Sequence, residues 1–155
     1  MPTRRDVLTR STQLAGMLAA LGLLPGLAHA QAAGYNSAAF DAKAMADVMK
    51  ALGAGAPVES KDVTITGPDI AENGAVVPVG AATTRPGVKR MLLLVEKNPA
   101  MLSALFDVTD AVEANFSTRV KMAQSSNVFA VAMMNDGKVL YAAKEIKVTL
   151  GGCGG

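Results

Sequence analysis

The sequence has very few of the side chains that enzymes most often use for catalysis. It contains one cysteine, one histidine and no tryptophan, and only six of its 155 residues are aromatic. The histidine, His29, lies in an N-terminal stretch that we expect to be removed, which leaves the mature chain without any. The mature chain therefore cannot form a Ser-His-Asp or Cys-His arrangement, a histidine-rich metal site, a CxxC redox pair or an internal disulfide.

The first thirty residues have the features of an export signal. Arg4 and Arg5 precede an uncharged apolar stretch, 14–27, which glycine and proline interrupt and which is too short for a good membrane span. Ala28-His29-Ala30 has the small-x-small pattern of a signal-peptidase site, so we expect cleavage after Ala30. These features predict a twin-arginine signal at residues 1–30 and a protein that works in the periplasm. A general secretory signal is the main alternative, ahead of a retained membrane anchor.

Removal of this signal leaves the chain electrically neutral. The whole sequence has fifteen basic and thirteen acidic residues. Residues 1–30 hold three of the basic and one of the acidic side chains, so the mature chain has twelve of each. The positive charge of the precursor is therefore no indication of nucleic-acid or membrane binding.

The stretch from Asn36 to Leu52 predicts one amphipathic helix. Asn36 or Ser37 can cap its start, and Gly53 and Pro57 end it. Apolar residues recur at every fourth position, and the charged residues lie largely opposite. The apolar positions are Phe40, Ala44, Val48 and Leu52, with Met45 and Met49 beside them. We expect this face to be a core or partner contact rather than a ligand site.

After Pro57 the pattern changes to short apolar runs separated by turn residues. The predicted strands cover 63–66, 75–79, 88–96, 102–108, 128–134, 139–143 and 144–150. Pro78 favours an edge strand or a bulge in the second run, and the continuous apolar run 91–95 predicts a buried strand. The stretch 101–112 can also be read as a helix. The clearest signal is Asp136-Gly137 between two apolar runs, which predicts a hairpin.

Six or seven short strands predict an all-β fold, an antiparallel β-sandwich preceded by the one helix. The chain then divides into the signal peptide at 1–30, the helix and β-sandwich at 31–150, and a terminal arm at 151–155. The sequence has no internal repeat and no glycine-rich phosphate loop.

The arm has the only cysteine of the sequence among glycines, in Gly151-Gly152-Cys153-Gly154-Gly155. Because glycine has no Cβ and little conformational preference, we expect the arm to be flexible and its sulfur to be exposed. From Leu150, three residues of extended chain span about 10 Å to Cys153. This reach suits insertion into a narrow cleft of another protein. We therefore interpret Gly151, Gly152, Gly154 and Gly155 as a swinging arm and Cys153 as its attachment point.

Nothing near Cys153 in the sequence would activate its thiol. The nearest basic residues are Lys144 and Lys147 on the preceding strand, and the terminal carboxylate of Gly155 disfavours a thiolate. A covalent carrier whose cargo is presented to separate enzymes accounts for a solitary, exposed cysteine on a thin arm. A dimer linked by an intermolecular disulfide is the alternative. An independent thiol enzyme is disfavoured by the missing histidine, and a lipoprotein is excluded by the position of the cysteine.

The sequence resembles the SoxY family along essentially its whole length. The resemblance is clearest at Ser117–Ser125, at Asp136-Gly137-Lys138 and at Lys144–Leu150 with the following GGCGG. Members of this family are sulfur-carrier subunits of the periplasmic thiosulfate-oxidising system. The resemblance implies an immunoglobulin-like β-sandwich with an N-terminal helix and covalent attachment of substrate to Cys153. It implies no catalytic residue, metal or cofactor in this chain.

The resemblance also implies partners. SoxZ, a second β-sandwich without its own signal, would form a heterodimer with this chain and be exported alongside it. In the family's cycle the haem enzyme SoxAX couples thiosulfate oxidatively to the arm cysteine, and SoxB hydrolyses the terminal sulfone to sulfate and leaves a persulfide. Where SoxCD is present, it oxidises the remaining sulfane sulfur. The expected function is thus covalent carriage of sulfur intermediates in thiosulfate oxidation.

Overall fold

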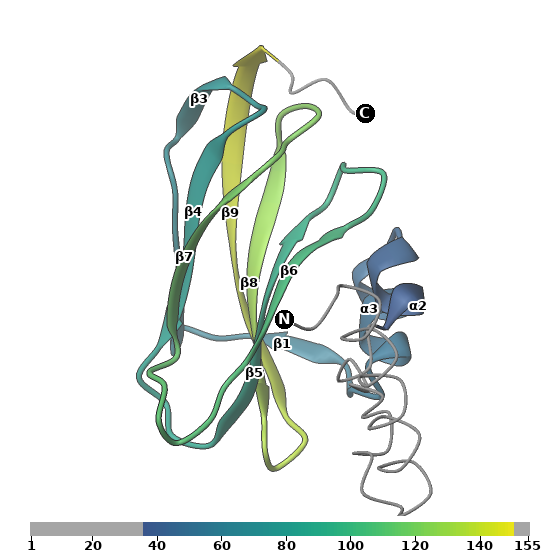
Figure 1. The fold of residues 1–155 in the computed structure, drawn as a ribbon, viewed down its shortest axis with the longest axis vertical. Coiled ribbons are helices and arrows are strands. Elements are labelled where there is room, and N and C mark those ends of the chain that lie inside the picture. The colour runs from purple at the N-terminus through teal and green to yellow at the C-terminus, as the bar shows by residue number, and fades with distance from the viewer. Residues whose placement is uncertain (1–35, 151–155) are drawn as a thin grey trace, which may run out of the picture. The chain divides into compact units, whose positions relative to one another are not determined.

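Figure 1 shows the fold in a computed structural model, which describes residues 36–150. The helices are α2 (Ser37–Asp41) and α3 (Met45–Ala51), and the strands are β1 (Pro57–Glu59), β2 (Val63–Thr66), β3 (Ile70–Asn73), β4 (Val77–Thr83), β5 (Val88–Val95), β6 (Leu102–Asp107), β7 (Asn115–Val120), β8 (Ser126–Met134) and β9 (Val139–Leu150). The predicted signal peptide and arm lie outside the described residues.

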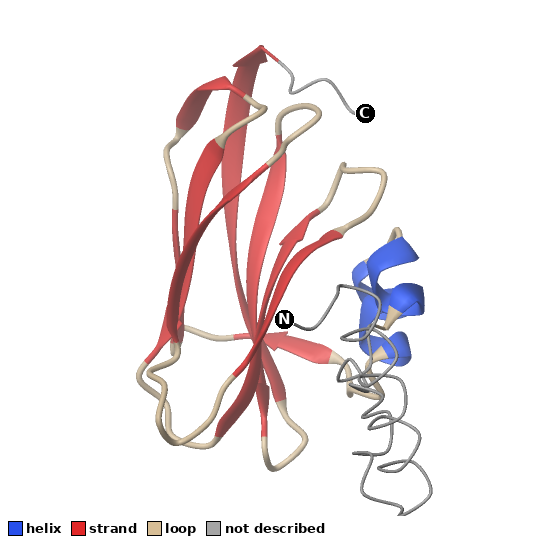
Figure 2. Cartoon of the chain, viewed as in Figure 1, coloured by secondary structure: helices blue, strands red, loops and turns tan. Residues whose placement is uncertain are grey.

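The strands form a β-sandwich, which confirms the predicted fold class. The larger sheet has the order β1-β9-β8-β5-β6 with β3 also pairing β9, and the smaller sheet has the order β2-β4-β7. The helices cover the outer face of the larger sheet, as Figure 2 shows. The larger sheet is therefore the middle layer, with one apolar core against the smaller sheet and a second core against the helices.

Strand β5 is buried on both faces, as its continuous apolar run predicts. Met91, Leu93 and Val95 belong to the core between the sheets. Leu92 and Leu94 belong to the core beneath the helices. All five side chains are inaccessible to solvent. A strand between two apolar layers has no polar face, so its sequence does not alternate.

The prediction of one helix over residues 36–52 is wrong, because the structure has two short helices there. Ala42, between α2 and α3, has an extended backbone (φ −68°, ψ 138°). Its carbonyl accepts a hydrogen bond from the N–H of Met101 at 3.0 Å. This contact with a distant loop breaks the helix. Asn36 caps α2, as predicted, and its Nδ2 also donates to the carbonyl of Ala51 at 2.7 Å, which ties the two helices together.

Most predicted strands are present, with changes at their ends. The runs 139–143 and 144–150 form one strand, β9, which follows β8 through the predicted Asp136-Gly137 turn, where Gly137 has φ 85°. The helical alternative for 101–112 is wrong, because β6 occupies its first half. The sequence did not predict β1, β3 or β7, which are short or largely polar. The antiparallel description also needs a correction, because β1 and β3 run parallel to β9.

Pro78 lies in β4, which is the middle strand of its sheet. The pairing of β4 with β2 runs from Gly80 to Thr83, whereas its pairing with β7 runs from Val77 to Ala82. At Pro78 the strand therefore has a neighbour on one side. A residue without a backbone N–H is tolerated where one side of a strand is open.

Candidate functional site

The arm predicted as the functional site lies outside the described residues, together with Cys153. The same holds for Arg4, Arg5, Ala28 and Ala30, the predicted signal residues. The structure places the residue to which the arm is attached. This residue is Leu150, the last of β9, at one end of the sandwich (Figure 1).

The last residues of β9 extend beyond β8, the strand with which most of β9 pairs. The register between β8 and β9 runs from Val139 to Ile146. The next four residues, 147–150, pair with β3 instead, in a parallel register that matches Ile70 with Lys147 and Asn73 with Leu150. The short strand β3 is therefore what keeps the end of β9 in a sheet.

A serine occupies the side of β9 from which β8 has withdrawn. The N–H of Val148 donates to Oγ of Ser125 at 2.9 Å. Ser125 belongs to the loop between β7 and β8. Its hydroxyl therefore satisfies a backbone donor that would otherwise lack a strand neighbour on that side.

Two further hydrogen bonds join the last residues of β9 to β3 and to the loop that follows it. The hydroxyl of Thr149 donates to the carbonyl of Glu72 at 2.9 Å. The N–H of Gly74 donates to the carbonyl of Leu150 at 2.7 Å. The backbone is thus hydrogen-bonded up to the residue before the arm.

Lys144 and Lys147, the basic residues nearest to the thiol in the sequence, both lie on β9 before Leu150. Lys144 lies six residues earlier, about 20 Å along the strand. Its Nζ lies 2.9 Å from Oδ1 of Asp69, and this hydrogen bond, with the positive charge behind it, holds the pKa of Asp69 below its usual value. The carbonyl of Asp69 also accepts from the N–H of Lys147 at 3.0 Å. Both lysines thus help to attach β9 to the segment that begins β3.

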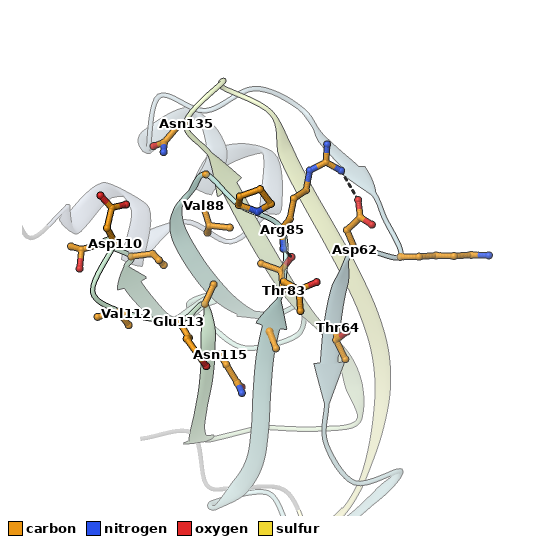
Figure 3. Close-up of a pocket in the computed structure, with 18 residues that line it drawn as sticks. Asp62, Thr64, Thr83, Arg85, Val88, Asp110, Val112, Glu113, Asn115 and Asn135 are labelled. Carbon is orange, nitrogen blue, oxygen red and sulfur yellow. Dashed lines mark hydrogen bonds and ion pairs between the residues drawn. The ribbon is translucent and has the colours of Figure 1, made fainter.

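A depression of about 750 Å³ lies at the other end of the sandwich (Figure 3). Its walls come from the loops after β1, β4, β6 and β8, and Asp62 and Arg85 form an ion pair on its rim at 2.5 Å. Asn135, on its wall, lies in the turn between β8 and β9. From the end of that turn, the twelve residues of β9 span about 40 Å to Leu150. An arm with a reach of about 10 Å from Leu150 does not extend to that wall.

The described residues lack two features, a cluster of metal ligands and a membrane-spanning helix. No group of three or more histidine, cysteine, aspartate or glutamate side chains there could hold a metal ion. Between residues 36 and 150, no helix is long and apolar enough to cross a membrane.

Sequence reasoning missed the residues that hold the end of β9. Ser125 and β3 have no local pattern that marks them, because β3 is only Ile-Ala-Glu-Asn. One signal in the sequence could have indicated them. The run that ends at Leu150 is longer than the run of β8, so its last residues need another neighbour.

Comparison with known proteins identifies a family and a fold. A family model described as "Sulfur oxidation protein SoxY" matches residues 48–153, from within α3 through β9 to Cys153. Among solved structures, the chain is similar to the sulfur carrier protein SoxY from Chlorobium limicola f thiosulfatophilum. The two are 35% identical over 66% of this chain and 93% of that chain, with a TM-score of 0.60.

A more distant likeness concerns the fold alone. The superoxide reductase (neelaredoxin) from Ignicoccus hospitalis has a TM-score of 0.50 with this chain. The two are 18% identical over 56% of this chain and 79% of that chain. No curated protein sequence matches this chain.

Proposed function

This chain belongs to the SoxY family of sulfur oxidation proteins, and on that premise we propose that it carries sulfur intermediates bound covalently to Cys153. One observation carries the proposal. The family match extends to Cys153, which is the only cysteine in the chain and lies three residues beyond the end of β9. The similar protein from Chlorobium limicola is itself named a sulfur carrier protein.

Two steps on Cys153 describe the proposed chemistry. In the first, the thiol of Cys153 and thiosulfate join through a new S–S bond, a proton is released, and two electrons pass to an oxidising haem partner. In the second, water attacks the terminal sulfone of the adduct, the S–S bond to it breaks, sulfate leaves and a persulfide remains on Cys153. The second step is a hydrolysis and needs no oxidant. The part of this chain is to supply the sulfur atom and present it, while its partners supply electron transfer and hydrolysis.

The proposed partners are those of the Sox system. We propose a heterodimer with SoxZ and transient contacts with SoxAX, SoxB and, where present, SoxCD. An enzyme that receives Cys153 must approach within about 10 Å of Leu150. Leu150, Ile70 and Val76 are large apolar side chains with more than half of their surface exposed at this end of the chain. Such side chains favour contact with another protein.

The proposed location is the periplasm, reached through the twin-arginine pathway. The features that support it are the arginine pair Arg4 and Arg5, the weakly apolar stretch after them and the cleavage pattern that ends at Ala30. Because the export pathway transports folded proteins, a SoxZ subunit bound in the cytoplasm could cross with this chain.

The test measures intact mass and peptide mass after incubation with thiosulfate and the oxidising haem partner. We expect one adduct per chain on the peptide that contains Cys153, and its removal by a reductant. The protein without its partner should gain no adduct, and Cys153→Ser should gain none with it. An adduct on Cys153→Ser, or one mapped upstream of Leu150, contradicts the proposal. A reductant-sensitive homodimer as the only product would favour the disulfide-linked dimer instead.

A further inference from the structure

We propose that β3 and Ser125 act as a clamp that fixes the start of the arm at Leu150, so that Cys153 swings on a tether of three residues. The arm clamp consists of Glu72, Gly74, Ser125 and Thr149, which are positioning residues. The inference rests on the proposed carrier function and adds how the reach of the carried sulfur is set.

The clamp is needed because β9 extends farther than its neighbour β8. Beyond Ile146, the pairing of β9 with β8 has ended. A strand without a neighbour on either side is not stable in water, because its backbone groups have no fixed partners. The parallel pairing with β3 replaces that neighbour on one side, and the hydroxyl of Ser125 replaces it at Val148 on the other.

The hold on Leu150 is connected to the core of the sandwich. Gly74 donates to the carbonyl of Leu150, and its own carbonyl accepts from the N–H of Met122 at 2.7 Å. The side chain of Met122 is fully buried in the core between the two sheets. The point at which the arm begins is therefore linked, through two hydrogen bonds, to a residue that cannot move without disturbing the core.

The loop that contains Met122 is held in turn by a third loop. The side chain of Asn98 donates to the carbonyl of Lys121 at 2.7 Å and accepts from the N–H of Ala123 at 3.1 Å. These two bonds lie on either side of Met122. Hydrogen bonds thus join three loops at this end of the sandwich, and one of these loops is bonded to the carbonyl of Leu150.

The clamp has a large effect on the reach of Cys153. With the clamp closed, the tether is the three residues 151–153 and extends at most about 10 Å. With the clamp open, β9 would be held only as far as Ile146, and the tether of seven residues would extend about 23 to 25 Å. For a partner docked on the body, the effective concentration of the sulfur falls as about the −3/2 power of tether length, which is a threefold to fourfold loss. A closed clamp therefore favours enzymes that dock close to this end.

The first test measures the clamp without sulfur chemistry. The mature protein, residues 31–155, is labelled with a nitroxide on its single cysteine, and amide signals are recorded by NMR. In Ser125→Ala/Thr149→Val the amides of Gly74 and Val148 should exchange with solvent about threefold to tenfold faster, because each lost bond contributes little on its own. The nitroxide should then broaden amides farther along the sandwich. Thr64→Val makes the same hydroxyl-to-methyl change at an exposed position of β2 and should alter neither result.

Either outcome of this measurement decides the inference. Unchanged exchange and unchanged broadening in the double variant would overturn it. If the double variant does not fold, Thr149→Val alone at its exposed position gives the same two readouts.

The second test asks whether the clamp acts through tether length. Four glycines inserted between Leu150 and Gly151 lengthen the tether without touching the clamp. The rate of adduct formation with the haem partner should fall by about threefold to fourfold in the insertion. In the double variant it should fall by a smaller factor, because the pairing with β3 remains and the clamp is open for only part of the time. Loss in the double variant without loss in the insertion, or an unchanged rate in both, contradicts control by tether length. If the parent takes up no adduct, the carrier function fails while the nitroxide measurement still decides the clamp.

Discussion

The N–H of Gly74 donates to the carbonyl of Leu150 at 2.7 Å, so the last residue of β9 is bound to the loop that follows β3. This distance is at the short end of the range for N–H···O hydrogen bonds. The pairing places the start of the arm beside β3, at the end of the sandwich opposite the depression at Asp62 and Arg85. A ligand bound in that depression would therefore lie beyond the reach of about 10 Å that we expect for the arm.

A larger side chain next to Cys153 should slow its reaction with the partner enzymes more than its reaction with small thiol reagents. We expect Gly152→Val and Gly154→Val to react with a small thiol reagent at nearly the parent rate, because the sulfur stays accessible. Coupling of thiosulfate by the haem partner should slow markedly, because a branched side chain widens what a narrow cleft must admit. Parallel kinetics with both reagents measure the two effects. Equal enzymatic rates for parent and variants would show that the arm does not enter a narrow channel.

The ion pair between Asp69 and Lys144 should appear in the titration of Asp69. Lys144→Met should raise the pKa of Asp69 toward the usual aspartate value, because the hydrogen bond and the positive charge are lost. Since the folded-state pKa is depressed, any stability that the pair contributes is present above the unfolded-state pKa. It is lost as the pH falls through the lower, folded-state value. NMR titration of the carboxyl carbon measures the shift.

A second ion pair supplies the control for this titration. Lys138 lies 2.8 Å from Asp136 and likewise lowers the pKa of that carboxyl. Lys138→Met should therefore raise the pKa of Asp136 and leave Asp69 unaffected. The interpretation fails if Lys144→Met leaves the pKa of Asp69 where it was.

Gly80 should not accept a side chain. A Cβ at this position would lie 2.5 Å from Oγ1 of Thr66 and 3.2 Å from the carbonyl of Phe116. We expect Gly80→Ala to lower the free energy of unfolding by about 1 to 3 kcal/mol, as overpacking does, and urea unfolding measures it. The loss should shrink in a Thr66→Ala background, where the closest contact is gone. Gly55→Ala is the control, because its nearest atom would be 3.7 Å away.

The mature chain should form a one-to-one complex with SoxZ. Without residues 1–30 the chain has a formal net charge of zero, which does little to oppose association. We expect an obligate-type heterodimer that buries well over ~1,200 Å² and stays intact on dilution, as sedimentation of the co-expressed pair can measure. Cys153→Ser should form the same complex, because the strands and both apolar cores are built from residues within 36–150. A monomeric variant in the presence of SoxZ would exclude this heterodimer.

Export should depend on the arginine pair. Replacing Arg4 and Arg5 with lysine should leave the precursor in the cytoplasm, because the twin-arginine pathway requires both guanidinium groups. Fractionation and the mass of the periplasmic chain measure export and the cut after Ala30. A normal periplasmic yield from the lysine variant would indicate a general secretory signal.

Features that depend on neighbouring residues could be predicted from the sequence. The Asp136-Gly137 hairpin follows from the positive φ that glycine adopts at little cost. The buried strand β5 follows from five consecutive apolar side chains. The break between α2 and α3 could not be predicted, because it depends on the carbonyl of Ala42 meeting Met101 in a loop far along the chain.

By itself, the sequence determined the chemistry available to this protein. Beyond its first thirty residues the chain has a single cysteine, which lies between glycines, and no histidine, so it can offer a thiol but no imidazole, and these are facts of covalent structure. Only the tertiary structure decided where the arm begins. The end of β9 is held by β3, by Gly74 and by Ser125, segments separated from it by at least twenty residues. Hydrogen-bond donors and acceptors are present on nearly every residue, so no local pattern says which distant segment will supply the partner.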